Sequence, residues 1–320
     1  MMTKPILCIG ELLIDFFCTD INSSLIEGEA FEKRAGGAPA NVCATIANFG
    51  GKAIFSGKVG ADPFGRFLKL TLDRQGVDTT HLKLDGDCPT TLAFVSLKED
   101  GQRDFIFNRG ADGRMTHADL DQNVIEQSSI LHFGSATALL DAPFQTMYLE
   151  TMWEANQANK FVSFDPNYRL DLWKRREVEF IGLAQKCIAM SDFVKVSDEE
   201  LELITGTGIK DLAEATQKLH QLGAKVVAVT LGKQGTYISN GLESGIVESI
   251  PIKAIDTTGA GDAFVGAMLY QFVLKDNPHD VLSDMNTLKR FTDKSNQVAA
   301  HVCTKYGAFE ALPAKNVIFG

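Results

Sequence analysis

The chain has 320 residues, of which 45% are hydrophobic and 22% are charged, so it can build one large α/β domain or two smaller domains. Its 31 lysines and arginines against 41 aspartates and glutamates give a net charge of −10. This charge argues against a nucleic-acid-binding protein and against binding to anionic membranes. The first apolar run is broken by Glu11 and Asp15, so we expect neither a signal peptide nor a membrane span.

Six cysteines are scattered along the chain. None of them forms a Cys-x-x-Cys pair, and no cysteine–histidine cluster has the spacing of metal ligands. Cys8 and Cys303 lie in apolar runs, where a free thiol behaves as a small hydrophobic group. We therefore expect a reducing, cytoplasmic compartment.

The first predicted element is the apolar run 6–10, which is typical of a buried strand in a parallel sheet. Glu11 and Asp15 follow it at once, and open α/β sheets bind ligands at the carboxyl ends of their strands. Asp15 could accept hydrogen bonds from a polyol or be a solvated acid in a turn. The local pattern does not choose between the two.

A glycine-rich stretch from Ala35 to Ala44 predicts a loop that enters a helix. Gly36 and Gly37 precede Pro39, a residue that favours the first helical turn. Asn41 lies in that turn, so it is a candidate ligand contact as well as a candidate cap.

The next stretch predicts a strand at 52–59 and a helix between Asp62-Pro63 and Gly76, which carry start and stop signals. From Thr90 to Phe107 the pattern changes to that of an antiparallel hairpin with a turn at 98–101, and it continues through Arg109. A hairpin inserted among βα units usually forms a lid or an oligomer surface, so we expect that role here.

After residue 130, strands and helices alternate. We predict strands at 130–134, 161–165, 193–196 and 225–230, helices at 143–155 and up to Gly223, a β pair at 236–239 and 246–250, and a closing helix at 287–303. Polar residues follow each of the first four strands, so they should collect along one edge of a parallel sheet. The whole chain, residues 1–320, is predicted to be one α/β domain with a β excursion.

The stretch from Ile255 to Phe264 carries the strongest chemical signal. Gly259, Ala260 and Gly261 have little or no side chain and precede an apolar helical pattern, so their N–H groups can receive an anion at a helix start. Asp262 follows directly. It could cap the helix or act as a general base beside the anion, and the spacing alone favours capping.

These pieces fit phosphoryl transfer to a hydroxyl, which needs a base, donors around the phosphoryl group and usually Mg²⁺. The chain has no Walker motif, and the G-x-G-x-x-G pattern that begins at Gly259 ends in Phe264, which disfavours a dinucleotide site. Glu200 with Ser197 could order metal-bound water, although a Ser-x-x-Glu at a helix start is also a capping box. Local evidence alone favours the capping box.

Two long motifs resemble those of the PfkB family of carbohydrate kinases, which have the ribokinase-like fold. The stretch from Gly36 to Gly60 is similar to the first family signature, and the stretch from Asp256 to Asp262 to the second. The resemblance covers nearly the whole chain. It implies a three-layer α/β/α fold with a mostly parallel central sheet and a small β-sheet lid formed by about 12–34 and 90–110.

The resemblance also implies roles for individual residues. Asp262 resembles the general base, and Gly259, Ala260 and Gly261 resemble an anion hole. The positions that match sugar-binding residues are Asp15, Gly37, Asn41, Phe107, Arg109, Asn167 and Arg169. Those that match nucleotide-binding residues are Lys195, Ser197, Thr230, Gly232, Gly235 and Asn296. Glu200 matches the residue that governs Mg²⁺, and Asp256 and Thr258 match residues near a monovalent-cation site, so ATP, Mg²⁺ and K⁺ are implied.

Within the family, stretches 108–112 and 165–169 look most like fructokinase. The implied reaction is ATP-dependent phosphorylation of the primary hydroxyl of fructose to fructose 6-phosphate. A 2-keto-3-deoxygluconate kinase or another sugar or nucleoside kinase is the alternative. The non-kinase alternatives are an inactive sugar-binding regulatory protein and a nucleotide-dependent oxidoreductase.

The resemblance further implies a small-molecule sugar and a nucleotide as partners, and a homodimer formed through the β lid. Two positions depart from the family pattern. Cys43 replaces a Ser, Thr or Ala of the first signature, and Ser197 stands where relatives carry Asn.

Overall fold

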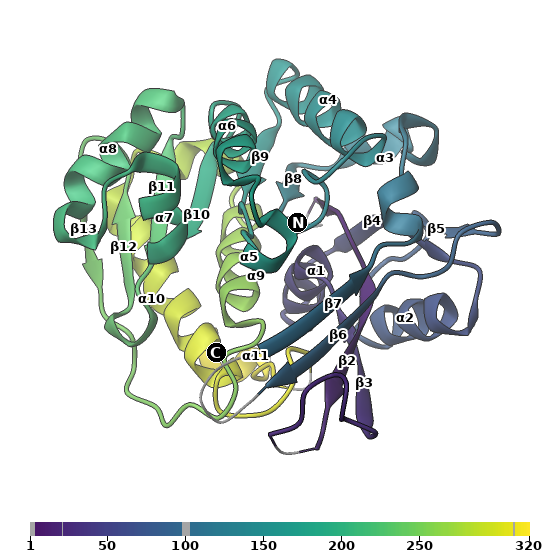
Figure 1. The fold of residues 1–320 in the computed structure, drawn as a ribbon. Helices are drawn as coiled ribbons and strands as arrows, with labels where there is room; N and C mark the ends of the chain where they lie inside the picture. Colours follow the sequence, from purple (N-terminus) through teal and green to yellow (C-terminus); the bar gives the residue numbers. More distant parts are fainter. Residues whose placement is uncertain (1–3, 21, 98–102, 310) are drawn as a thin grey trace.

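Two β-sheets of unequal size carry the fold in the computed structural model, which describes residues 4–20, 22–97, 103–309 and 311–320 (Figure 1). From edge to edge, the large sheet contains β13 (Ser244–Val247), β12 (Thr236–Ser239), β11 (Val226–Thr230), β10 (Phe193–Ser197), β9 (Phe161–Phe164), β8 (Ile130–Phe133), β1 (Ile6–Ile9), β4 (Ala53–Gly60) and β5 (Leu82–Asp85). Strands β11 through β5 run parallel, and β12 and β13 add an antiparallel edge.

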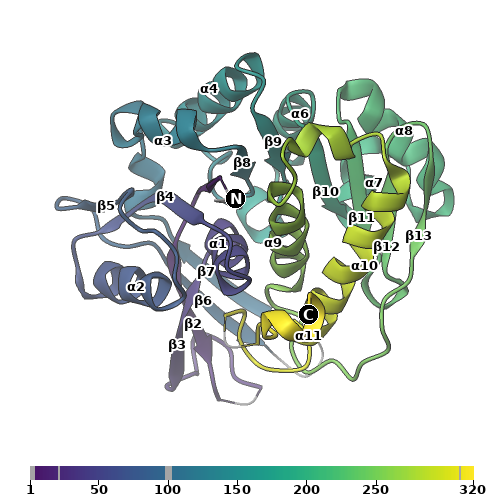
Figure 2. The same ribbon diagram turned by 180° about the vertical axis from the view of Figure 1, so that it is seen from behind.

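Helices cover both faces of the large sheet, because its strands alternate their apolar side chains between two cores. The face with Leu131 and Val194 packs against α3 (Gln122–Gln127), α4 (Phe144–Gln157), α6 (Glu177–Ile188), α7 (Asp198–Thr205) and α8 (Leu212–Leu222). The face with Ile130 and Phe193 packs against α1 (Ala38–Asn48), α2 (Pro63–Arg74), α9 (Ala260–Val273) and α10 (Met285–Val302), seen from behind in Figure 2. The short helices are α5 (Leu170–Trp173) and α11 (Lys315–Ile318). The expected three-layer α/β/α architecture is confirmed.

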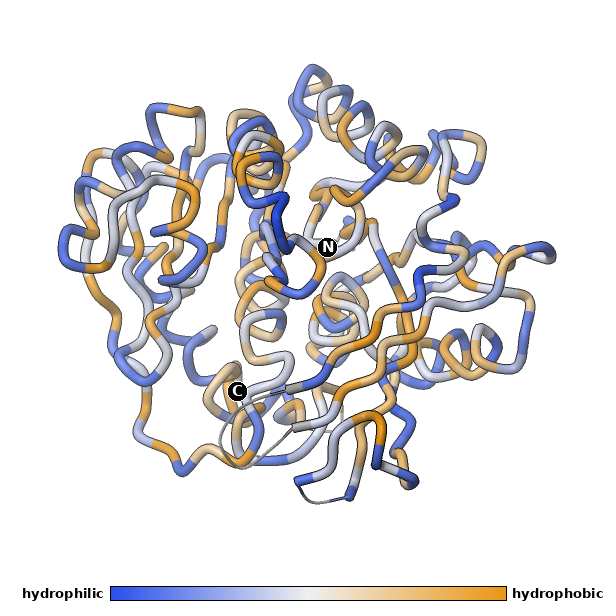
Figure 3. The backbone as a smooth tube through the Cα atoms, viewed as in Figure 1, coloured by the Kyte–Doolittle hydropathy of each residue, from blue (hydrophilic) through white to orange (hydrophobic). Residues whose placement is uncertain are grey.

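The small sheet is the expected lid, with strand order β3 (Phe31–Gly36), β2 (Leu13–Cys18), β6 (Leu92–Leu97) and β7 (Arg103–Asn108). Figure 3 shows the apolar stretches that run along these strands. Alternation in β2 places Asp15 on the inner face, toward a cleft, and Phe16 on the outer face. Phe16 stacks on Phe94 with ring centroids 5.0 Å apart and meets Phe64 of α2 edge-on, so the outer face is anchored to the body.

Most predicted boundaries agree with the structure. Asp62 caps α2 by accepting from the Gly65 amide at 2.8 Å, and Pro39 lies in the first turn of α1, as its position predicts. The strand predicted at 246–250 is wrong by several residues, since β13 ends at Val247, which pairs with the first residue of β12. Beyond Val247, β12 offers no partner. The turn predicted at 98–101 lies outside the described residues.

Helix α9 is the most buried helix of the fold. All of its residues from Asp262 to Val273 are buried, because α9 lies between α1 and α10 and against the large sheet. Its first turn is therefore fixed in position at the carboxyl edge of the sheet. In the part of the chain that the structure describes, we find no helix long and apolar enough to cross a membrane.

Candidate active site

A cleft of about 1110 Å³ separates the inner face of the lid from the carboxyl edge of the parallel strands. It brings together residues that are far apart in the chain. Of the residues predicted to form the site, those that line it are Asp15, Gly37, Asn41, Phe107, Asn167, Arg169, Lys195, Ser197, Glu200, Thr258, Gly259, Gly261 and Asp262. Those that do not line it are Arg109, Thr230, Gly232, Gly235, Asp256, Ala260 and Asn296.

The start of α9 presents backbone donors to this cleft. Gly259 is the residue before the helix and has φ +76°, and a Cβ on it would come within 2.5 Å of the Ala308 Cβ, so only glycine fits. The amides of Gly261 and Asp262 have no backbone acceptor among the described residues. The Ala260 amide donates to Thr257 O at 3.2 Å, so it is a weaker candidate for the anion hole than the sequence suggested.

The Asp262 side chain does not cap its own helix. It is 7% exposed, and its Oδ2 accepts a hydrogen bond of 2.7 Å from Asn41 Nδ2. Burial raises the pKa of the Asp262 carboxyl, against the opposing effects of the Asn41 hydrogen bond and of the Arg169 and Lys195 charges. A buried carboxylate with a raised pKa, next to open amides in a cleft, is suited to take a proton. The structure thus disagrees with the capping alternative.

A buried lysine lies directly beside these amides. Lys195 is on β10, and its Nζ lies 3.1 Å from Asp165 Oδ2 and 4.0 Å from Glu200 Oε2. Burial alone would lower the pKa of Lys195, but the carboxylates of Asp165, Glu200 and Asp262 outweigh it, so the pKa is raised and the ammonium stays charged. A Cβ on Gly261 would be 3.2 Å from this Nζ, so the positive charge adjoins the helix start.

Asp165, the partner of Lys195, was not among the predicted site residues. It directly follows β9, at the same sheet edge where the other polar residues collect, and this placement is the signal that could have found it. Burial raises the pKa of Asp165, and the Lys195 charge opposes that shift. Asp165 also accepts a hydrogen bond of 3.2 Å from the Asn167 amide, which helps to fix the turn that follows.

Five residues that were predicted to bind sugar line one end of the cleft, which we call the sugar end: Asp15, Gly37, Asn41, Asn167 and Arg169. Asn167 donates to Gly134 O at 2.7 Å and accepts from Arg169 at 3.2 Å. Burial raises the pKa of Asp15 to about 6, although Arg169 and Arg34 oppose it. The Oδ1 of Asn41 is buried and has no partner among the described residues, which leaves one acceptor open for a ligand hydroxyl.

Glu11 organises the sugar end, although the sequence suggested only that it follows β1. It is 1% exposed, and it accepts from the Ser135 hydroxyl and from the amides of Ala38 and Ala136 at 3.1 and 3.4 Å. Burial raises the pKa of Glu11 to about 7 against these hydrogen bonds. One carboxylate thereby ties the end of β1 to the start of α1 and to the loop after β8.

The predicted nucleotide residues lie at the other end of the same sheet edge. Thr230 pairs with Ser197 in register, and the 3₁₀ turn η4 (Gly232–Gln234) follows β11. Asn296 does not approach the cleft: it accepts from Thr236 at 2.7 Å and donates to Val247 O at 2.9 Å. Its amide therefore ties α10 to β12 and β13, and the expectation of an adenine contact finds no support in this geometry.

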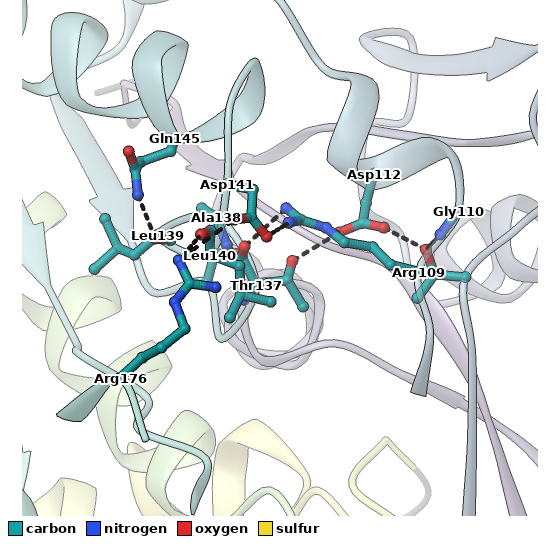
Figure 4. A network of polar contacts seen from close by, with 12 residues as sticks. Arg109, Gly110, Asp112, Thr137, Ala138, Leu139, Leu140, Asp141, Gln145 and Arg176 are labelled. Carbon is teal, nitrogen blue, oxygen red and sulfur yellow. Dashed lines mark hydrogen bonds and ion pairs between the residues drawn. The ribbon is translucent and has the colours of Figure 1, made fainter. Parts of the chain in front are cut away.

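Arg109 also points away from the cleft. Its Nη2 donates to Thr137 O at 2.9 Å, and its Nη1 lies 3.4 Å from Asp141 Oδ2 (Figure 4). The predicted direct contact with sugar is therefore not what the structure displays, because the guanidinium is held by a loop behind the sugar end. Sequence spacing could not indicate this, since the partners of Arg109 lie about 30 residues further along the chain.

The residues predicted to lie near a monovalent cation form a closed turn. Asp256 accepts from the Thr258 amide at 2.9 Å and from the Gly307 amide at 3.3 Å, and it lies 3.9 Å from Arg34 of the lid. These contacts hold the loop that leads into Gly259. Arg34 thus links strand β3 to the loop before α9.

Glu200 completes a capping box at the start of α7 and also binds the amide of Tyr168, which lies in the loop after β9. Its Oε2 accepts from the Ser197 amide and its Oε1 from the Tyr168 amide, each at 2.8 Å, while its own amide donates to Ser197 Oγ. Among the described residues, no group of three His, Cys, Asp or Glu side chains could hold a metal directly. A divalent cation beside Glu200 would therefore have to take most of its oxygen ligands from phosphate groups and water.

Comparisons with known proteins give one consistent result. A family model described as pfkB family carbohydrate kinase matches residues 3–315. A rice (Oryza sativa subsp. japonica) protein named Fructokinase-1 is 40% identical and covers 98% of this chain and 96% of its own. A Probable fructokinase-4 of Arabidopsis thaliana is 38% identical over 98% and 95%.

Solved structures agree with these matches. The fructokinase of Xylella fastidiosa with bound ATP has a TM-score of 0.88 at 33% identity, covering 99% of this chain and 97% of its own. The fructokinase of Vibrio cholerae O395 with fructose, ADP and calcium has a TM-score of 0.83 at 29% identity, covering 100% and 99%.

Proposed function

The chain belongs to the pfkB family of carbohydrate kinases, and we propose that it is an ATP-dependent fructokinase that converts fructose to fructose 6-phosphate. One observation carries the proposal: a buried carboxylate, Asp262, lies beside the open amides of a helix start, within a cleft whose neighbouring wall is rich in polyol-binding side chains. The fructokinase names of its relatives favour fructose over 2-keto-3-deoxygluconate.

Asp262 takes the proton of the sugar hydroxyl as that oxygen attacks the γ-phosphorus of ATP. The new oxygen–phosphorus bond forms as the bond from the γ-phosphorus to the β,γ-bridging oxygen breaks, and ADP leaves with that oxygen. The amides of Gly261 and Asp262 and the Lys195 ammonium stabilise the negative charge on the transferred phosphoryl group. Asn41 holds Asp262 in place and offers its free Oδ1 to the sugar.

Asp15 and Arg169 orient the sugar from opposite sides of the cleft. Asp15 is on lid strand β2 and accepts sugar hydroxyl hydrogen bonds, while Arg169 follows β9 and donates. The lid excludes water above the site, which limits transfer of the phosphoryl group to water.

We assign the nucleotide and its metal to the other end of the same sheet edge, which meets the cleft at Ser197 and Glu200. Ser197, Thr230 and the turn Gly232–Gln234 line up at the sheet edge beside Lys195, and we assign the nucleotide to them. Glu200 would order waters around Mg²⁺, which when bound neutralises phosphate charge. Asp256 and Thr258 are the candidates for a monovalent-cation effect on the loop before α9.

We further propose that residues 1–320 act as one domain and that the lid mediates a homodimer. The half-exposed Ile106 on β7 supports the dimer, because it shares the outer face of the lid with Phe94. Sedimentation at micromolar concentration tests this. The six free cysteines support a reducing, cytoplasmic location.

A coupled assay of ADP release tests the proposed function. Fructose, 2-keto-3-deoxygluconate, ribose and adenosine are compared at equal concentration with ATP and Mg²⁺, and we expect fructose to give the highest kcat/KM. A higher kcat/KM for 2-keto-3-deoxygluconate would identify that sugar, and not fructose, as the preferred substrate. Fructose binding without turnover of any sugar would favour the inactive sugar-binding regulatory protein. NAD binding would point instead to an oxidoreductase.

A further inference from the structure

A buried carboxylate, Asp112, joins the lid to the loop behind the sugar end (Figure 4). Its side chain is fully buried, and it directly follows the lid in the 3₁₀ turn η1 (Ala111–Arg114). It does not line the cleft, so it cannot contact the sugar. The mechanism above gives it no role.

The neighbours of Asp112 come from the ends of two lid strands, β6 and β7, and from the loop behind the sugar end. The Thr91 hydroxyl, at the start of β6, donates to Oδ1, and the Thr137 hydroxyl donates to Oδ2 at 2.7 Å. Arg109 Nε, at the end of β7, lies 3.6 Å from Oδ2 as an ion pair. Two hydroxyl groups thus donate to Asp112, and Arg109 places its positive charge within ion-pair distance of the same carboxyl group.

Thr91 extends this connection to the strand that carries a sugar ligand. Its Oγ also accepts from the Gly110 amide at 2.8 Å, and its carbonyl accepts from the Ile14 amide at 3.1 Å. Ile14 is adjacent to Asp15 on β2. Thr91 therefore connects Asp112 to the residue next to Asp15, the lid carboxylate assigned to the sugar.

The loop 134–141 is held almost entirely by side chains. Its carbonyls at Thr137, Leu139 and Leu140 accept from Arg109, Gln145 and Arg176 at 2.9, 2.6 and 2.7 Å (Figure 4). From the opposite side, Glu11 binds Ser135 and Ala136. Ala136 and Thr137 line the cleft, so the position of this loop sets the shape of the sugar end.

We propose that Asp112, with Arg109, is a positioning residue that sets sugar affinity by fixing loop 134–141 against the lid. The inference rests on the proposed sugar-kinase function. Binding then requires little reorganisation, because lid and loop are already held at the spacing that the sugar needs. Within the described part of the chain, Ser197, Thr230 and the turn Gly232–Gln234 make no contact with this network, so we expect nucleotide affinity not to depend on it.

The test is Asp112→Asn, with KM measured separately for fructose and ATP. An amide places a donor against the Thr91 or Thr137 hydroxyl and removes the charge facing Arg109. We expect KM for fructose to rise about tenfold, KM for ATP to stay within about twofold, and kcat to change less than about threefold. Asp284→Asn is the matched control. Asp284, at the start of α10, also accepts a hydrogen bond from a threonine hydroxyl, that of Thr287, at 2.6 Å. It should leave both KM values unchanged.

A second pair of variants keeps the test decisive if Asp112→Asn fails to fold. Thr91→Val removes the hydroxyl that donates a hydrogen bond to Asp112, and Thr91→Ser retains it. Thr91 does not line the cleft, so neither change touches the sugar directly. We expect the valine variant to have a higher KM for fructose than the parent, and the serine variant to have the KM of the parent. The proposal is overturned if these variants lower only the melting temperature, or raise both KM values equally.

Failure of the proposed function would be visible in the parent protein, which would not phosphorylate fructose. The comparison of variants would then be made with 2-keto-3-deoxygluconate or ribose, whichever the parent turns over.

Discussion

The sugar end of the cleft and the nucleotide end of the same sheet edge are built by different means. At the sugar end, the side chains of Asn41 and Asn167 are 9% and 4% exposed, and each is held by a hydrogen bond to another part of the chain. The nucleotide end uses the main-chain turn Gly232–Gln234, which is exposed and contains a glycine with φ +56°. Lys195 and Asp262 lie between them.

This difference teaches where selectivity can arise. A polyol is distinguished by the positions of its hydroxyls, so its partners must be fixed side chains supported by a buried network. Phosphate groups are the same in every nucleotide, and backbone amides at a turn or helix start suffice to bind them. We therefore expect substitutions at the sugar end to affect sugar kinetics alone, and those at the nucleotide end to have smaller effects.

The largest effect should come from the residue between the two ends. Asp262→Asn removes the proton acceptor but preserves shape and the contact with Asn41, so kcat should fall about 10²- to 10⁴-fold. Calorimetric titration should give parent-like affinities for fructose and for a non-hydrolysable ATP analogue. Loss of both affinities would assign Asp262 a structural role instead.

The next effect concerns the buried lysine. Lys195→Met removes the cation that lies beside the buried carboxylates of Asp165 and Glu200, so the free energy of unfolding should fall by about 3–5 kcal/mol. kcat should fall about 10²-fold through the lost charge at the phosphoryl group. Adding Asp165→Asn should recover part of the stability and none of the rate. Full recovery of the rate would show that Lys195 acts only through folding.

At the sugar end, Asp15 predicts a pH dependence. Its carboxylate must be ionised to accept two hydrogen bonds, and its pKa is raised to about 6, so kcat/KM for fructose should fall as the pH drops through about 6. Asp15→Asn should raise KM for fructose about tenfold and remove the part of this decline that Asp15 causes, while the part due to Asp262 remains. If the variant keeps the parent profile, another group is responsible.

At the nucleotide end we expect the smallest effect. Thr230→Val removes the hydroxyl of the residue that pairs with Ser197 across β10 and β11. The hydrogen bond that this hydroxyl donates to Val196 O is long, at 3.4 Å. KM for ATP should rise by about two- to fivefold while KM for fructose is unchanged. A larger change in the fructose value than in the ATP value would contradict the division between the two ends.

Sequence patterns predicted the large sheet well, because both of its faces are covered and most of its central strands are largely apolar. They missed β5, whose alternating Leu82-Lys83-Leu84-Asp85 run gives only a four-residue signal at the sheet edge. They also displaced β13, whose end is set by its partner β12 and not by its own residues.

The sequence indicated many of the residues that line the cleft, but it could not indicate the contacts that these residues make. The stretch from Gly259 to Asp262 is local, so its backbone geometry could be inferred from the sequence. The hydrogen bond from Asn41 to Asp262 joins residues 221 positions apart, and local spacing cannot indicate it. Arg109 was assigned to the sugar, whereas long-range packing directs it to Asp112 and Thr137.

The most direct test of the account is the pH profile of kcat at saturating fructose and ATP, for the parent and for Asp262→Asn. Because kcat reports ionisations in the complex, the parent should lose activity on acidification with a single pKa above the usual aspartate value of about 4. The variant should be slower at every pH and lack that decline. A variant that keeps both the parent rate and the same decline would contradict the claim that Asp262 takes the proton.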